Sequence, residues 1–147
     1  DILALDGIDE MYIGLNDLHL SYGMTFMFQL LADGTVDRLV EKFKKRGVPY
    51  GFGGIARLGG GMLPAELVMA EHYRLGSTRA ILARAFCNSD KVIDEVELRE
   101  TFNCGMQELR VLESTLSAQT ADFFESNRKF VQKSVSDIVE SIKNKQS

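Results

Sequence analysis

The sequence of 147 residues has few cysteines, no excess of positive charge and no long apolar segment. Its cysteines, Cys87 and Cys104, lack the spacing of a metal site and are too few for a disulfide framework, so we expect a reducing compartment, the cytoplasm. A formal net charge of −4 argues against nucleic-acid binding, which normally needs a basic surface. No apolar run reaches the roughly 18 residues of a membrane span.

The sequence also lacks a basic and apolar leader, and it begins with Asp1 rather than Met. We therefore expect no secretory signal peptide, and either the removal of an earlier segment or a piece of a longer chain. Hydrophobic residues make up 45% of the chain, which is enough for one compact core and marginal for two domains.

Three short apolar runs in the first ninety residues are typical of buried strands. They lie at residues 11–15, from Val48 into a glycine-rich segment, and at about 78–84. None shows the clean polar alternation of a half-exposed strand, and helical segments separate them. This alternation predicts an α/β fold with a parallel sheet covered by helices.

The segments between the expected strands have helical signals. Residues 24–31 are apolar throughout and predict a short buried helix. Residues 35–46 have apolar side chains at helical spacing, with Thr35 as the expected N-cap. A third helix is expected from Pro64, which suits a first helical turn, to Gly76, which suits the residue after a helix.

The last sixty residues change character, with one glycine, no proline and no strand-like run. They predict two long amphipathic helices with a break near residues 117–120 and a cap at Asn88 or Ser89. The two apolar stripes are Phe102, Met106, Leu109, Leu112 and Leu116, and then Val131, Val135, Ile138 and Ile142. We expect residues 1–88 to form βα units and residues 89–147 a helical extension.

Polar side chains follow each expected strand. Asp17 follows the first, Arg57 the second and Arg84 the third. Because chemistry in parallel α/β folds gathers at the carboxyl ends of the strands, these groups suit a divalent metal and an anionic substrate. The backbone amides near Gly14, Asn16 and Asp17 could form an anion cradle.

Each of these residues also has a structural interpretation. Asp17 fits an N-cap equally well, and Arg57 fits an ordinary surface arginine. Arg84 fits a structural ion pair with Glu71 or Asp90. His19 and His72 fit structural histidines, although His19 would lie on the same side as Asp17 in an extended segment.

The glycine-rich segment at residues 51–61 does not predict nucleotide binding. Gly51, Gly53 and Ala56 match G-x-G-x-x-G/A, but they lie within a strand rather than after it. No Walker lysine follows, and no acidic residue lies at the expected distance. Backbone room near a ligand or tight packing inside a barrel explains these glycines better.

The segment IDEMYIGLNDLHLSYG at residues 8–23 resembles a motif of the HpcH/HpaI aldolase and citrate lyase β-subunit family, (I/V)D-x-(I/L)-x-I-G-x-x-D-L-(S/T)-x-x-x-G. KKRGVPYGFGGIARLG and LGSTRAILAR look like that family's next strand and its last. The resemblance covers about the first ninety residues. It implies the C-terminal part, about three βα units, of a TIM-barrel-like fold, followed by the two-helix extension.

The resemblance also implies a function. The parent chain would be a divalent-metal-dependent carbon–carbon lyase or aldolase acting on a pyruvate-like 2-keto acid or a CoA-thioester relative. Asp17 would bind Mg²⁺ or Mn²⁺, and Arg57 or Arg84 would contact the substrate. The backbone amides that would hold the substrate carboxylate belong to Gly14, Leu15, Asn16 and Asp17.

This chain departs from the family in ways that matter. His19 replaces the usual Ser or Thr, and the family's second metal ligand, a glutamate, would lie before Asp1. A complete barrel takes about 250 residues, so the fragment alone should be inactive. The alternative is a non-catalytic interaction domain that forms homo-oligomers through its C-terminal helices or an exposed sheet edge.

Overall fold

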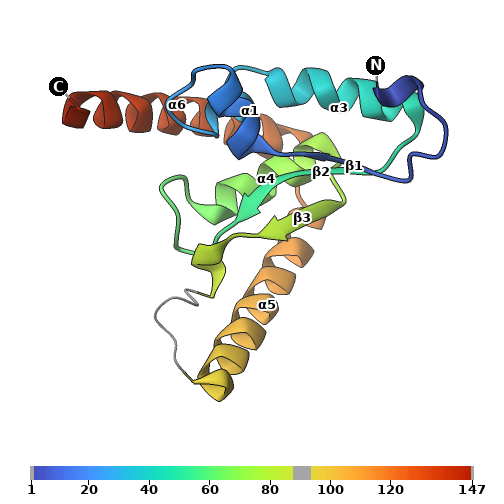
Figure 1. The fold of residues 1–147 in the computed structure, drawn as a ribbon. Helices are drawn as coiled ribbons and strands as arrows, with labels where there is room; N and C mark the ends of the chain where they lie inside the picture. Colours follow the sequence, from blue (N-terminus) through green and yellow to red (C-terminus); the bar gives the residue numbers. More distant parts are fainter. Residues whose placement is uncertain (1, 88–93, 147) are drawn as a thin grey trace.

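The computed structural model describes residues 2–87 and 94–146. The elements are η1 (Ile2–Ala4), β1 (Met11–Ile13), α1 (Leu15–Ser21), α2 (Gln29–Ala32), α3 (Thr35–Arg46), β2 (Tyr50–Ile55), α4 (Ala65–Leu75), β3 (Arg79–Leu82), η2 (Arg84–Phe86), α5 (Glu95–Ser117) and α6 (Ala121–Gln146). Strands and helices alternate up to β3, and two long helices follow (Figure 1).

The three strands form one parallel sheet in the order β1-β2-β3. Met11 pairs with Tyr50, and Gly51 pairs with Arg79. The ladder between β2 and β3 is irregular between Gly51 and Gly54. The expected α/β class with a parallel sheet is therefore confirmed, and the strand order follows the chain order.

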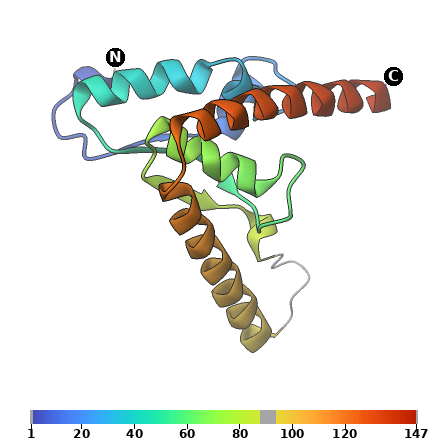
Figure 2. The same ribbon diagram turned by 180° about the vertical axis from the view of Figure 1, so that it is seen from behind.

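Helices cover one face of this sheet. Phe52 of β2 is fully buried and stacks on the imidazole of His72 in α4, with ring centroids 3.8 Å apart. Arg74 of α4 makes an ion pair with Asp37 of α3, so α3 and α4 belong to the same layer. The long helix α6 packs across α4 and α2, as the view from behind shows (Figure 2).

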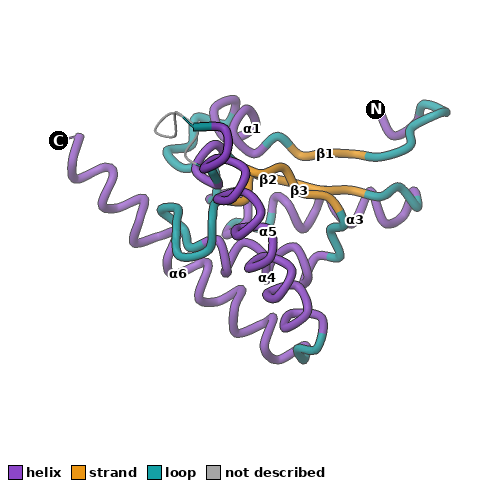
Figure 3. Tube along the Cα trace, turned by 90° about the horizontal axis from the view of Figure 1, so that it is seen from below, coloured by secondary structure: helices purple, strands orange, loops and turns teal. Residues whose placement is uncertain are grey.

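The other face of the sheet, which we call the open face, carries Tyr12, Gly51, Gly54, Arg79 and Ile81. Tyr12 is 38% exposed and Ile81 is 57% exposed, although both lie within strands. In the view from below, α4 and α6 lie on one side of the strands (Figure 3). Parallel sheets are normally buried on both faces, so this exposure is unusual.

The helix α5 is less embedded than α6. Its buried residues are Gly105, Leu109 and Leu116, which lie from the middle of the helix onward. Gly105 allows close packing, since a Cβ there would lie 3.0 Å from the ring of Phe86. The first half of α5 extends away from the sheet (Figure 1).

The expectation of a strand over residues 11–15 was wrong at its end. The strand stops at Ile13, and Leu15 already begins α1, with Gly14 as the N-cap residue. Leu15 and His19 are the buried residues of this helix, one turn apart, so tertiary packing selects a helix. The seven-residue segment carries too little periodicity for the sequence to reveal it.

The expected helix over residues 24–31 is shorter, because only Gln29–Ala32 is helical. The side-chain Oε1 of Gln29 accepts hydrogen bonds from the backbone N–H groups of Thr25 and Phe26, at 2.9 and 2.8 Å. These bonds hold the preceding residues in a turn. Apolar composition alone cannot distinguish a buried turn from a buried helix.

Helix ends were predicted more accurately at the C-terminus than at the N-terminus. Gly47 and Gly76 end α3 and α4 in the left-handed conformation, as expected. Thr35 is not an N-cap, since Gly34 has that place and the carboxylate of Asp33 accepts from the Thr35 N–H. Pro64 is the N-cap of α4 rather than a residue of its first turn.

The two C-terminal helices and the break between them are confirmed, at Glu95–Ser117 and Ala121–Gln146. The expected caps Asn88 and Ser89, and the boundary between residues 88 and 89, lie outside the described residues. Asp94 caps α5, because its carboxylate accepts from the Val96 N–H at 3.0 Å. Leu109, Leu116, Val131 and Val135 join the core of the βα units.

Candidate functional site

Asp17 lies in the first turn of α1, directly after the end of β1. It is not the N-cap, because Gly14 has that place and no side chain caps this helix. The Asp17 carboxylate leans toward Gly14, where a Cβ would lie 3.5 Å from Oδ2. The first backbone N–H groups of a helix have no partner within it, so the amides of residues 14–17 are available beside this exposed carboxylate.

His19 does not join Asp17. Because residues 15–21 are helical rather than extended, side chains two residues apart point in different directions. His19 is buried, and its Nδ1 lies 3.2 Å from the carbonyl oxygen of Leu15. The structural interpretation of His19 therefore fits this geometry better than a role beside the carboxylate.

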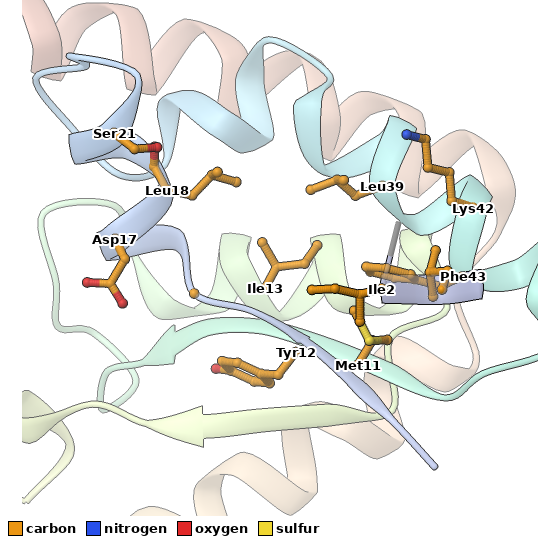
Figure 4. Close-up of a pocket in the computed structure, with 12 residues that line it drawn as sticks. Ile2, Met11, Tyr12, Ile13, Asp17, Leu18, Ser21, Leu39, Lys42 and Phe43 are labelled. Carbon is orange, nitrogen blue, oxygen red and sulfur yellow. The ribbon is translucent and has the colours of Figure 1, made fainter. Parts of the chain in front are cut away.

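A cavity of about 590 Å³ lies beside Asp17, between β1, α1 and α3. Ile13, Leu18 and Leu39 form its apolar wall, and Figure 4 shows the Asp17 carboxylate pointing away from them. Lys42 lies on the α3 side of the cavity (Figure 4). The cavity suits an apolar group, and Asp17 lies at one end of it rather than at its centre.

Arg57, two residues after β2, is engaged by α5. Its Nε and Nη2 donate to the two carboxylate oxygens of Glu108 at 3.3 and 3.4 Å. This pairing raises the pKa of Arg57 and lowers the pKa of Glu108. Arg57 is therefore a carboxylate-binding residue that holds a carboxylate of its own chain, rather than an isolated surface arginine.

Arg84 lies in η2, two residues after β3, and its side chain is exposed. The expected pairing with Glu71 was wrong, because Glu71 is fully buried and pairs with Arg74 at 2.7 Å. The alternative partner, Asp90, lies outside the described residues. Asp17, Arg57 and Arg84 each follow a strand of one parallel sheet, so all three belong to its carboxyl-terminal edge.

A metal ion would need more ligands than this edge supplies. Within residues 2–87 and 94–146, no group of three His, Cys, Asp or Glu side chains could hold a metal ion. Asp17 is a suitable single ligand for Mg²⁺ or Mn²⁺, since it is a hard oxygen donor and accessible. Further ligands would have to come from residues other than these.

The glycines of β2 serve packing against neighbouring elements. A Cβ on Gly51 would collide with the backbone of Arg79 in β3. Gly53 has a φ of +61°, and a Cβ there would lie 3.0 Å from the side chain of Leu15. The phenol of Tyr12 donates to the carbonyl oxygen of Gly53, which ties β1 to this strand. Tight packing, one of the two expected roles, accounts for both positions.

Sequence reasoning missed two sets of residues. The first is Glu108, because nothing in the sequence indicates that α5 returns to the end of β2. The second is a buried polar cluster around Arg74, which donates to Glu71 and Asp37 while Asn127 of α6 donates to Glu71 at 3.3 Å. Only the spacing of Glu71 and Arg74, three residues apart on one helix, was readable in advance.

Comparison with models of known protein families, with curated proteins and with solved structures found no match to this chain. The resemblance to the aldolase and citrate lyase family therefore depends on the motif at residues 8–23 and stays a hypothesis. None of the helices in the described part of the chain has the length and apolar character needed to cross a lipid bilayer.

Proposed function

We propose that this chain is the C-terminal part of a TIM-barrel-like, divalent-metal-dependent carbon–carbon lyase or aldolase acting on a pyruvate-like 2-keto acid. The observation that carries the proposal is the placement of Asp17. It follows a parallel strand directly, in the first turn of a helix, with the amides of residues 14–17 beside it. A barrel of this kind keeps its active site at this edge of the sheet.

The sheet supports the barrel part of the proposal. Consecutive strands are neighbours, whereas a doubly wound sheet reverses its strand order at the ligand site. The open face would be the inside of the barrel, where side chains of the other strands would cover Tyr12 and Ile81. The free edge of β1 would pair with the preceding strand of the barrel.

The residues at the carboxyl-terminal edge have distinct roles in this proposal. Asp17 supplies one oxygen ligand to Mg²⁺ or Mn²⁺, and the amides of residues 14–17 hold the substrate carboxylate. When bound, the metal supplies Lewis-acid stabilisation of negative charge on the keto oxygen. Arg57 or Arg84 contacts the substrate anion, since guanidinium groups bind carboxylates bidentately.

The experiment is exchange of the pyruvate methyl protons in D₂O with Mg²⁺, followed by proton NMR on the intact parent chain. We expect exchange in the parent chain and its collapse in Asp17→Asn. Asp122→Asn is the matched control, because Asp122 is also an exposed first-turn aspartate, in α6, and should leave exchange unchanged. A folded, metal-loaded parent chain without exchange would contradict the proposal.

The second candidate is a non-catalytic domain that forms homo-oligomers. The exposed apolar side chains favour it, namely Tyr12 and Ile81 on the open face and Val96 and Phe102 on α5. Sedimentation equilibrium of the 147-residue chain tests it. A dimer that Ile81→Glu dissociates would place the contact on the open face, and a monomer at every concentration would argue against this candidate.

A further inference from the structure

A second cavity, of about 620 Å³, lies between α4, α5 and the start of β3. It is remote in the sequence from Asp17, and none of the residues of the candidate site lines it. Met69, Leu82, Phe102, Met106 and Leu109 supply most of its apolar wall. Its size falls in the range of small-molecule sites, which are apolar with a few placed polar groups.

One of those polar groups is His72, which lines this cavity and is only 4% exposed. Its Nδ1 lies 2.7 Å from the hydroxyl oxygen of Ser77, and its ring stacks on Phe52. Its Nε2 is buried and has no hydrogen-bond partner among the described residues. Buried polar nitrogens are normally hydrogen-bonded, so an unpartnered nitrogen on a residue that lines a cavity points to a missing partner.

The hydrogen bonds around Ser77 determine which nitrogen of the His72 imidazole carries the hydrogen. The Ser77 hydroxyl has one hydrogen, and it donates to the carbonyl oxygen of Arg79 at 3.1 Å. With this orientation, His72 Nδ1 carries a hydrogen and donates it to the Ser77 oxygen. Two hydrogen bonds then form, from Nδ1 to Ser77 and from Ser77 to Arg79. If Nε2 carried the hydrogen instead, the Ser77 hydroxyl would have to donate to Nδ1, and only that one hydrogen bond would form. Nε2 is therefore an unprotonated acceptor, and burial keeps the ring neutral by lowering the pKa of His72 to about 4.

The charged groups of the cavity already have partners. Arg110 and Glu113 of α5 pair with each other at 2.6 Å, and Arg79 pairs with Glu10 at 2.9 Å. A charged ligand would have to break one of these pairs. A neutral ligand with an apolar body and one donor group satisfies Nε2 and leaves both pairs intact.

We infer that this cavity binds a small neutral aromatic compound carrying a hydroxyl group, which donates a hydrogen bond to His72 Nε2. The ring of the ligand packs against the methionine, leucine and phenylalanine side chains of α4 and α5. This inference does not depend on the proposed aldolase function, because it uses none of the same residues.

The experiment is an NMR titration of the 147-residue chain with phenol and, separately, with toluene, which has nearly the same shape but no donor. We expect phenol to shift the amide signals of the lining residues and to move the His72 Nε2 resonance upfield from its unprotonated position. Toluene should bind about tenfold more weakly, the effect of one neutral hydrogen bond. In His72→Phe, phenol and toluene should bind equally.

Met106→Trp provides a second variant, since it fills the cavity from α5 and leaves His72 in place. It should abolish phenol binding. Equal affinity for phenol and toluene in the unaltered chain would overturn the inference, as would phenol binding that leaves the Nε2 resonance unmoved. Should His72→Phe fail to fold, the Nε2 resonance of the unaltered chain decides the question.

Discussion

The helices α5 and α6 are similar in length and in their amphipathic sequences, but they are packed very differently. Val131 and Val135 of α6 are buried, and Asn127 donates to the Leu67 carbonyl and to Glu71 of α4. On α5, Leu109 and Leu116 of the apolar stripe are buried, and Val96 and Val111, which lie outside the stripe, are more than 60% exposed. Each apolar stripe therefore buries two side chains in the core, and the two helices differ in the elements against which they pack.

The two helices differ in the elements against which they pack. The helix α6 crosses both α4 and α2 and contacts a polar cluster whose carboxylate, Glu71, is fully buried. The helix α5 packs against α4, and it also holds Arg57 through Glu108. We expect α6 to belong to the cooperative core and α5 to be attached more weakly.

The largest expected effect compares one buried and one exposed valine. Val131→Asp places a carboxylate where the native side chain is 1% exposed, and should lower the free energy of unfolding by about 3 kcal/mol or more. Val111→Asp, at a position that is 68% exposed, should change it by about 0.5 kcal/mol or less. Urea unfolding followed by circular dichroism measures both. Similar losses would show that Val111 is also buried in solution.

The next effect tests the burial of His72, which lines the cavity between α4 and α5. Burial lowers the pKa of His72 from 6.5 to about 4, so the unfolded chain binds this proton at higher pH than the folded chain. The stability from neutral His72 is thus complete above about pH 6.5 and is lost as the pH falls toward 4. By linkage this amounts to about 3 kcal/mol at most.

Urea unfolding between pH 4 and pH 7 measures this dependence. His72→Phe is the reference, because it keeps an aromatic ring on Phe52 but cannot titrate. The carboxylates contribute to both proteins, so the difference isolates His72. An NMR titration of His72 with a midpoint near 6.5 would mean that water reaches the ring and that the imidazole is not buried in solution.

A smaller effect tests the polar anchor of α6. Asn127→Ala removes the amide that donates to the buried carboxylate of Glu71, and should cost about 2 kcal/mol of unfolding free energy. Gln132→Ala is the control, since Gln132 also donates from α6, to the Ala32 carbonyl, but is exposed. Thermal unfolding of both variants measures this. An equal loss of stability in both would show that the buried hydrogen bond stabilises the fold no more than the exposed one.

The smallest effect concerns the attachment of α5 at Arg57. The guanidinium holds the pKa of Glu108 below its ordinary value, so Arg57→Gln should return that pKa toward normal. The pairing favours folding above the ordinary pKa of the carboxyl, and this contribution is lost as the pH falls. Carbon-13 NMR titration of the glutamate side chains measures the pKa. An unchanged Glu108 would mean that the pair does not persist in solution.

Local patterns in the sequence predicted much of the fold correctly. The apolar spacing over residues 35–46 and the glycines that end α3 and α4 gave those helices, and three apolar runs gave the parallel strands. These signals are readable because a helix needs a residue that tolerates the left-handed conformation at its end, and a buried strand needs continuous apolar side chains. They also placed Asp17, Arg57 and Arg84 after consecutive strands.

Tertiary structure decided what those signals leave open. The strand expected over residues 11–15 stops at Ile13, because Leu15 and His19 are buried in α1, and two similar amphipathic helices pack against different elements. The sequence by itself determined that three apolar segments form parallel strands and that Gly47 and Gly76 end two helices. Contacts between distant segments decided that Arg57 holds Glu108, and that Glu71 meets Arg74 and Asn127, because such pairings depend on where whole elements pack.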